Sequence, residues 1–479
     1  MTMKKLPFLS GQRTSSRLAP VFLALLLSGC AVGPDYHRPA VSVPAHYKEA
    51  QGWREAAPQD AQNKGDWWSV YHDNTLSGLL RQVAVSNQNV AQYEAQYRQA
   101  RALVGEARSD LLPGATYSGS STRSGSASTG TGQRTASDSH SLQASASWEV
   151  DIWGKLRRTL EENKASAQAS EAELANITLS AQSELAQDYF QLRIMDQQIA
   201  LYQQSVEAYQ RYLTIIENKY QAGSESRATL AQAQMQLETS RASALDLSWQ
   251  RAQTEHAIAI LLGKTPAEFS LPVTKAMTAT LPAIPQAVPS TLLERRPDIA
   301  YAERTVAAAN AAVGVAIAGY YPDLTLSATG GFTSSALHNL LSLPNRVWSL
   351  GPSLSGTLLD FGATSAKVEQ ARAAYDADVA SYRQAVLTGF EEVENYLVEL
   401  HTLQNEIVAQ QNATSAAQES ARVTRNQYEA GMIDYLDVAT TENSSLSQQQ
   451  SLLSLQSTQW VASVQLIAAL GGGWREASR

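Results

Sequence analysis

Apolar residues recur at steps of three and four along two long segments of the chain, residues 155–220 and 363–428. This spacing predicts helices with a narrow apolar seam of the coiled-coil kind, whose other faces are polar. The first segment has neither Gly nor Pro, and the second is interrupted only by Gly389. A continuous helix of that length would extend roughly 100 Å. The seams include Leu185, Tyr189, Leu192, Val206, Leu213 and Ile216 in the first segment, and Phe390, Val393, Leu397 and Leu400 in the second.

Four shorter stretches alternate apolar and polar residues with a period of two, which predicts β-strands. They are residues 114–123, where the pattern is weakest, 141–150, 324–333 and 348–358. Each is about ten residues long, the length of a tilted strand that crosses a bilayer. A half-buried sheet of a soluble protein would alternate in the same way.

The strands are expected to form two hairpins, within residues 113–150 and 322–360. Polar segments rich in Ser and Gly, residues 124–140 and 334–346, are expected to be their loops. Large aromatic residues lie within or just past the strands, where the aromatic girdle of a membrane sheet would be found. These residues are Trp148, Trp153, Trp348 and Phe361.

The chain contains this succession of elements twice, which indicates an internal duplication. Pro113 and Pro322 are 209 residues apart. The second repeat is one residue shorter before Gly362, and from there on equivalent residues of the two repeats are 208 apart. Glu184 matches Glu392 in this register. The matching glycines are Gly154 with Gly362, Gly223 with Gly431, and Gly263 with Gly471.

Each repeat is predicted to hold a first helix, a hairpin, a long helix and a returning helix. The first helices are expected at about residues 76–110 and 297–319, and the returning helices at 227–262 and 435–470. Gly223 and Gly431 are suited to end the long helices in a left-handed conformation. The predicted division of the chain is 1–29 signal peptide, 30–75 tail, 76–263 first repeat, 264–290 linker, 291–471 second repeat and 472–479 C-terminal tail.

The N-terminus has the features of a bacterial lipoprotein signal. Basic residues precede a short apolar run, residues 21–27, which is too short to span a bilayer. Leu27-Ser28-Gly29-Cys30 follows, and cleavage before Cys30 would leave its thiol to carry a diacylglycerol. An ordinary secretory signal with a chance cysteine is the alternative. Ala31 favours the outer membrane, since lipoproteins kept in the inner membrane usually have Asp there.

Charge and composition exclude several functions. The signal holds four of the 37 basic residues and no acidic one, so the mature chain has 33 basic and 45 acidic residues. A net charge of −12 disfavours nucleic acid as a partner. Cys30 is the only cysteine, and no histidine pair has metal-ligand spacing. No P-loop or nucleophile elbow is present, so we expect neither an enzyme nor any cofactor besides the covalent lipid.

Closure of a membrane sheet requires more than one copy of this chain. An open edge in hydrocarbon leaves N–H and C=O groups unpaired, and about eight strands are the practical minimum for a barrel. Two copies would supply eight strands and three copies twelve. The helices would then continue the wall of the barrel around a water-filled bore.

The whole mature chain resembles the outer-membrane factor family, the TolC- and OprM-like lipoproteins. The most specific stretches are Cys30 to Tyr36 (CAVGPDY) and residues 292–303 (LLERRPDIAYAE). The resemblance implies a mainly α fold with a membrane β-barrel, in a homotrimer with a twelve-stranded barrel, a periplasmic helical barrel and an equatorial collar. It also implies docking to a periplasmic adaptor and an inner-membrane pump of the resistance-nodulation-division type.

The resemblance places two further functions at the turns between the long and returning helices. Gly223, Ser224, Glu225, Gly431, Met432 and Ile433 are expected to meet the adaptor, although the two glycines could be helix caps alone. The family's closed gate is formed by tip residues that face the axis. Asp437 falls where such an aspartate occurs, and Tyr435 and Arg227 are nearby candidates. Thr440 replaces a second aspartate that some relatives have one turn later, and an ordinary solvated Asp437 is the alternative.

The function that follows is a passive outer-membrane exit duct for small molecules such as drugs and toxic organics, with a role in multidrug resistance. Type I protein secretion and metal-ion efflux are alternatives that use the same channel. A periplasmic coiled-coil adaptor lipoprotein is a less favoured alternative, because it would not explain two alternating hairpins.

Overall fold

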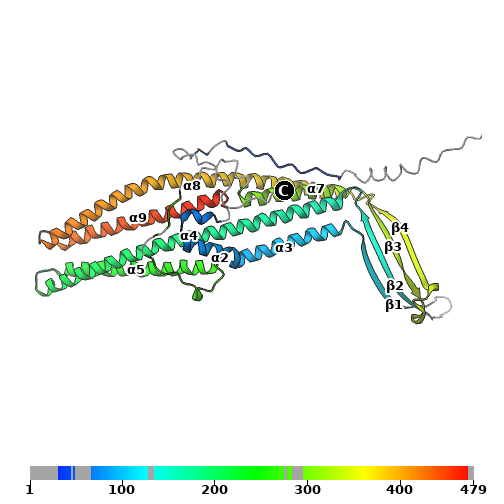
Figure 1. The fold of residues 1–479 in the computed structure, drawn as a ribbon, viewed down its shortest axis with the longest axis horizontal. Helices are drawn as coiled ribbons and strands as arrows, with labels where there is room; N and C mark the ends of the chain where they lie inside the picture. Colours follow the sequence, from blue (N-terminus) through cyan, green and yellow to red (C-terminus); the bar gives the residue numbers. More distant parts are fainter. Residues whose placement is uncertain are drawn as a thin grey trace, which may run out of the picture. The chain divides into compact units, whose positions relative to one another are not determined.

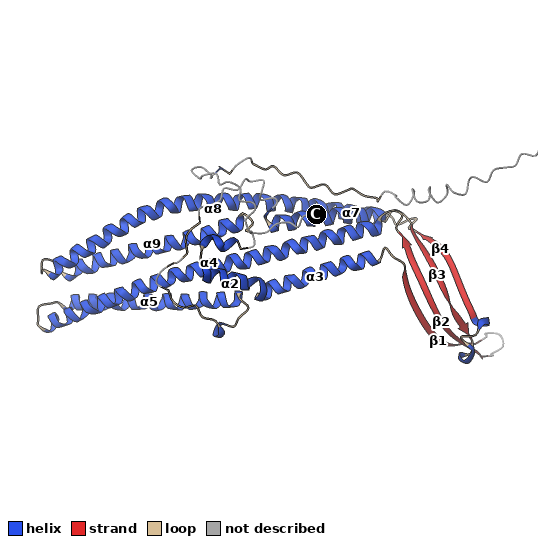
Figure 2. Cartoon of the chain, in the orientation of Figure 1, coloured by secondary structure: helices blue, strands red, loops and turns tan. Residues whose placement is uncertain are grey.

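The computed structural model describes residues 31–44, 47–48, 66–127, 134–274, 277, 279–282 and 295–472. Helices dominate, and the strands form one sheet (Figures 1 and 2). Cys30 and the signal peptide lie outside the described residues. The longer helices are α2 (Asn74–Ser86), α3 (Gln88–Ser109), α4 (Lys155–Gln221), α5 (Arg227–Leu261), α7 (Pro297–Ala318), α8 (Ala363–Glu429) and α9 (Tyr435–Ala469).

The predicted pairs of long and returning helices are confirmed in both repeats. α4 and α8 each have 67 residues, and α5 and α9 each have 35. In the described part of the chain, none of the helices combines the length and apolar character that a transmembrane helix needs.

The first helix of repeat one is two helices, which corrects the prediction of one helix over 76–110. α2 begins at Asn74 because the Asp73 carboxylate accepts from the amides of Thr75 and Leu76, at 2.8 and 2.9 Å. α2 ends at Asn87, whose side-chain oxygen accepts from the amides of Asn89 and Val90 and so starts α3. A second capping residue therefore divides the helix.

The sheet is antiparallel with the strand order β1-β2-β3-β4. The strands are β1 (Gly114–Ala127), β2 (Arg134–Val150), β3 (Asp323–Ser334) and β4 (Arg346–Ser355). The predicted loop at 124–140 is wrong over most of its length, because β1 and β2 continue pairing through it. Ser124 lies opposite Ser137, and their hydroxyls are 3.1 Å apart. Leu358, expected at the end of the fourth strand, lies beyond β4.

Two compact units can be described separately. The sheet unit comprises Met1–Pro39, Gln99–Gln168 and Arg304–Ala380, and the helical unit comprises Ala40–Arg98, Ala169–Glu303 and Ser381–Arg479. In the helical unit, an aromatic core forms where the 3-10 turn η2 (Trp67–Tyr71) packs on α4 and α9. The Phe190 ring stacks on Trp460 with centroids 4.6 Å apart, and the Tyr71 ring lies 5.0 Å from Phe190. The repeats are thus joined by their own side chains.

Candidate functional site

One face of the sheet is apolar across all four strands. Residues directly opposite in an antiparallel sheet share a face, so the pairing register defines cross-strand rows. One row runs from Ala115 through Ala146 and Ala328 to Leu350. Neighbouring rows on the same face are Tyr117-Ala144-Gly330-Trp348, Trp148-Leu326-Pro352 and Val150-Leu324-Leu354. Trp348 and Leu350 are each 74% exposed, so the protomer leaves this face uncovered.

The apolar band has the height of a membrane core. It extends along β2 from Val150 to Leu142, which is roughly 26 Å at about 3.3 Å per residue. The next row on that face is polar, with Ser121, His140 and Ser334. The alternation predicted from sequence is therefore one continuous band in the folded sheet, bounded by polar residues at the end where His140 lies.

The opposite face is mostly polar over the same length, with Val347 as its apolar exception. Its side chains are mostly Ser and Thr, and some bond across the strands. The Ser120 and Ser141 hydroxyls are 2.8 Å apart, and the Ser145 and Thr329 hydroxyls 3.2 Å apart. A sheet with one apolar and one hydrated face is suited to separate lipid from a watery interior.

The four candidate girdle residues occupy different environments. Trp148 and Trp348 lie in the second rows from opposite ends of the band. The indole N–H of Trp148 donates to the Leu111 carbonyl at 3.0 Å. Trp153, just past β2, donates to the Pro322 carbonyl at 3.0 Å and stacks on the ring of Tyr321. Phe361 is 93% exposed and has a φ of 52°.

The outer edges of β1 and β4 have no strand beside them within the described chain. β1 bonds to β2 alone and β4 to β3 alone. Such edges cannot remain open in a hydrocarbon medium, because their backbone groups would lose hydrogen bonds. A sheet in that medium therefore needs a partner strand at each of these two edges.

The residues that follow Cys30 form a strap, Ala31–Asp35, that is fixed beside the end of β2. The Val32 amide donates to the Trp153 carbonyl at 2.9 Å, and Asn310 donates to the Pro34 carbonyl at 3.0 Å. A Cβ on Gly154, which has a φ of +82°, would lie 2.6 Å from the Ala31 Cβ. The described part of the chain therefore begins, at Ala31, beside the end of β2.

Arg158 is the main side chain that holds the strap. Its side chain is only 5% exposed, and its guanidinium bonds the Asp35 carboxylate at 2.8 Å and Glu161 at 2.7 Å. It also donates to the carbonyls of Val32 and Gly33. Burial lowers the pKa of Arg158, but its two carboxylate partners outweigh burial and raise it on balance. Arg158 could not be recognised from the sequence, since no neighbouring residue marks it as buried.

A second charge network holds the linker between the repeats. Asp196 is fully buried and accepts from Arg251 at 2.6 Å, from Arg193 at 3.2 Å and from the Thr274 amide at 3.1 Å. The same two arginines donate to the carbonyls of linker residues, Arg251 to Leu271 and Arg193 to Pro272, each at 2.8 Å. The i,i+3 spacing of Arg193 and Asp196 was the only visible signal for this network.

The two helix turns, residues 221–226 and 429–434, have the same backbone. Gly223 and Gly431 have φ values of +73° and +72°, and each donates to the carbonyl three residues earlier at 2.9 Å. Ser224 and Met432 donate five residues back, which completes the Schellman pattern. A Cβ on either glycine would meet nothing within 4 Å. The cap role is therefore shown by geometry, whereas adaptor contact remains a prediction.

The candidate docking side chains differ in exposure. Met432 is 67% exposed, and Ser224 is also exposed, whereas Glu225 and Ile433 are half-buried. Of the candidate gate residues, Asp437 and Arg227 are exposed. Tyr435 is 1% exposed. The structure thus brings Asp437 to the surface and encloses Tyr435 within the protomer.

Tyr435 belongs to an aromatic cluster that joins the two helical hairpins near their turns. Its ring lies 5.8 Å from Tyr212 of α4 and 6.1 Å from Tyr428 of α8. Lys219 lies over the Tyr428 ring at 4.6 Å and bonds its hydroxyl at 3.3 Å. The Tyr435 hydroxyl is buried and has no hydrogen-bond partner among the described residues. Burial is also the main cause that raises the pKa of Tyr435 above its ordinary value.

No metal-binding cluster accompanies these surfaces in the part of the chain that is described. There, no three His, Cys, Asp or Glu side chains gather as a metal site would need. The features that stand out are instead a two-faced sheet with open edges, a bound N-terminal strap and two exposed helix turns.

Comparison with known proteins agrees with this geometry. The family model for outer membrane efflux proteins matches residues 79–264 and 288–472, which correspond to the two repeats. The chain is 28% identical over 463 residues to the cation efflux system protein CusC of Escherichia coli O6:H1, covering 96% of this chain and 99% of CusC. It is 27% identical over 476 residues to the probable efflux pump outer membrane protein TtgC of Pseudomonas putida, covering 97% and 96%. Among solved structures, the outer-membrane channel OprN is similar with a TM-score of 0.86 at 30% identity, covering 93% of this chain and 100% of OprN.

Proposed function

This chain belongs to the outer membrane efflux protein family and is an outer-membrane channel of tripartite efflux pumps; we propose that it is a passive exit duct for drugs and toxic organic molecules. The similarity to TtgC, named as an efflux pump component, is one support. The observation that carries the proposal is the continuous apolar face with two open strand edges.

We propose that three copies close the sheet into a twelve-stranded barrel. In each copy, the free edge of β1 would pair with β4 of the next copy, so every backbone group in the hydrocarbon region would find a partner. The Ser, Thr and Gln face would line the bore. This arrangement accounts for the polar character of one face and for the exposure of Trp348, Leu350 and Leu354 on the other.

Cys30 is proposed to carry the lipid that anchors the N-terminus. The strap supports this proposal, because Ala31 is fixed against Gly154 at the end of β2. A lipid on the preceding residue would then be close to the apolar band that faces the membrane. The buried guanidinium of Arg158 would keep the anchor at that height.

The helix turns are proposed to dock a periplasmic adaptor, which joins the channel to an inner-membrane pump of the resistance-nodulation-division type. Met432, Ile433, Ser224 and Glu225 would contact the adaptor around Gly223 and Gly431. The exposed Met432 and the open space around both glycines support this role. Asp437, Arg227 and Tyr435 are proposed to control the opening at the same end.

A metal-ion cargo is the second candidate, because CusC is named as a cation efflux protein. A deletion strain should be tested for sensitivity to dyes, antibiotics, bile salts, copper and silver. Hypersensitivity to organic compounds, restored by the intact gene, is expected. Sensitivity to metals alone would replace the first candidate with the second. Loss of a secreted protein with no change in sensitivity would overturn both.

A further inference from the structure

The two repeats place different groups at one equivalent position of the helical unit. In the second repeat, Arg296 precedes α7 and is 8% exposed. Its guanidinium bonds the Glu392 carboxylate at 2.6 Å, both Asp298 oxygens at 2.7 and 3.0 Å, and the Ala469 carbonyl at 3.1 Å. Gly389 leaves room beside it, since a Cβ there would lie 3.4 Å from the Arg296 Nε.

In the first repeat, the same positions hold residues that cannot supply a guanidinium. The offsets of 209 and 208 place Asn87 at the position of Arg296, and Leu261 at that of Ala469. Asn87 keeps one bond, from its amide to the Leu261 carbonyl at 2.8 Å, as Arg296 does to Ala469. The remaining counterparts are Asn89 for Asp298, Ala181 for Gly389 and Glu184 for Glu392.

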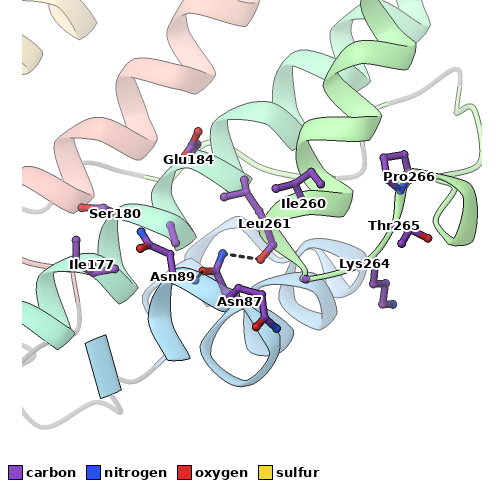
Figure 3. Close-up of a pocket in the computed structure, with 13 residues that line it drawn as sticks. Asn87, Asn89, Ile177, Ser180, Glu184, Ile260, Leu261, Lys264, Thr265 and Pro266 are labelled. Atoms are coloured by element: carbon purple, nitrogen blue, oxygen red, sulfur yellow. Dashed lines mark hydrogen bonds between the residues drawn. The ribbon is translucent and has the colours of Figure 1, made fainter. Parts of the chain in front are cut away.

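A cavity of about 520 Å³ lies at this position in the first repeat (Figure 3). Asn87, Asn89, Ala181, Glu184 and Leu261 all line it, so the residues equivalent to Arg296 and its neighbours border a hollow, and Asn89 and Glu184 are exposed to solvent there. The dashed line of Figure 3 marks the one bond that is kept, from Asn87 to Leu261. The walls are otherwise largely apolar, and include Ile177, Ile260 and Pro266.

Glu184 is a solvent-exposed carboxylate of this lining. It has no hydrogen bond or ion pair among the described residues, whereas its counterpart Glu392 is bound to Arg296. Lys264 is the cation of the lining, and no bond joins it to Glu184 within the described chain. The cavity therefore keeps a carboxylate at the position of Glu392, has the neutral Asn89 in place of Asp298, and lacks the guanidinium.

We propose that this cavity binds a small organic cation with a guanidinium or amidinium head, whose charge partner is Glu184. The planar head would take the place that the Arg296 guanidinium has in the second repeat, and would donate to Glu184 and to the Asn89 side-chain oxygen. An apolar body would lie against Ile177 and Ile260. The volume is sufficient for one aromatic ring with its amidinium group.

The test uses p-aminobenzamidine with the full-length channel purified in detergent, and calorimetry or fluorescence to measure binding. Saturable binding is expected, and the neutral analogue p-aminobenzamide should bind at least about tenfold more weakly, since a hydrogen-bonded charge contributes about 1.5–3 kcal/mol. Equal binding of the two probes would overturn the proposal.

Two variants test the site itself. Glu184→Gln, which keeps the side-chain shape, should lower the affinity about tenfold. Glu207→Gln removes an exposed carboxylate farther along α4 and should leave the affinity unchanged. Asn87→Arg combined with Ala181→Gly rebuilds the second-repeat arrangement. This double variant should no longer bind the probe, while its thermal unfolding midpoint should stay close to that of the natural protein. Unchanged affinity of Glu184→Gln for p-aminobenzamidine, or unchanged binding of p-aminobenzamidine by the folded double variant, would contradict the proposal.

Discussion

The backbone at Gly33 is so close to that at Gly314 that a Cβ on Gly33 would lie 2.5 Å from the Gly314 Cα. Gly33 also has a φ of +96°, a conformation that side chains rarely adopt. The strap behind Cys30 is therefore packed directly on α7 with no room for any other residue.

Gly33→Ala should detach the strap from the sheet unit. The added methyl group meets backbone atoms that cannot rotate away, and the positive φ adds strain of about 1 kcal/mol or more. Limited proteolysis should cut the N-terminus faster, and the thermal unfolding midpoint should fall. Gly105→Ala is the matched control, because a Cβ at Gly105 meets nothing within 4 Å. Equal proteolysis of both variants would contradict the packing described here.

Asp196→Asn should destabilise the helical unit by about 3–5 kcal/mol, the usual effect of breaking a buried ion pair from one side. Arg193 and Arg251 would lose the buried carboxylate that they share, and the linker bonds at Leu271 and Pro272 would weaken. Chemical denaturation followed by circular dichroism measures this loss. Glu238→Gln, which removes an exposed pair with Arg241, should have little effect. A similar midpoint for the two variants would contradict the role of Asp196.

Asp188→Asn should stabilise the channel in a pH-dependent way. Burial, with a smaller contribution from the Glu184 carboxylate, raises the pKa of Asp188 to about 7. The unfolded value is about 3.9, so ionisation begins to penalise the folded state above pH 4 and does so fully above pH 7. The thermal unfolding midpoint of the variant should therefore exceed that of the natural protein at pH 8 and equal it at pH 4. Thermal scans at both pH values measure this, and an equal shift at both would be inconsistent with the raised pKa.

Tyr435→Phe should be neutral or slightly stabilising, because the hydroxyl it removes is buried without a partner. The ring contacts with Tyr212 and Tyr428 would remain. Tyr428→Phe is the comparison, since it removes the bond to Lys219 and should cost about 0.5–1.5 kcal/mol. A larger loss in Tyr435→Phe than in Tyr428→Phe would indicate that the assembled channel gives this hydroxyl a partner.

Asp437→Ala should raise the leak conductance in planar bilayers and reduce the cation preference. Three exposed carboxylates around an axis attract cations and repel anions, so their removal should change both properties. Glu225→Ala removes one carboxylate from the other helix turn and controls for net charge. If conductance and selectivity stay as in the natural protein, Asp437 has no part in the gate.

The sequence by itself determined the elements and their duplication. Helices and strands have periods of 3.6 and 2 residues that neighbouring side chains alone reveal, so α4, α8 and β3 fall where the pattern predicts. The role of the glycines at the helix turns can also be recognised from neighbouring residues, because the backbone conformation at Gly223 and Gly431 depends on a few residues around them.

Only the tertiary structure decided which distant groups meet. Arg158 and Asp35 are 123 residues apart, and their charges give no local sign of pairing. Asn87 ends α2 because it caps α3 and bonds Leu261 of a distant helix, which no periodicity shows. The register in which the four strands pair brings their separate alternating runs together as one apolar band. Which distant residues pair depends on the free energy of long-range packing and hydrogen bonding. These contacts become defined once the whole chain has folded.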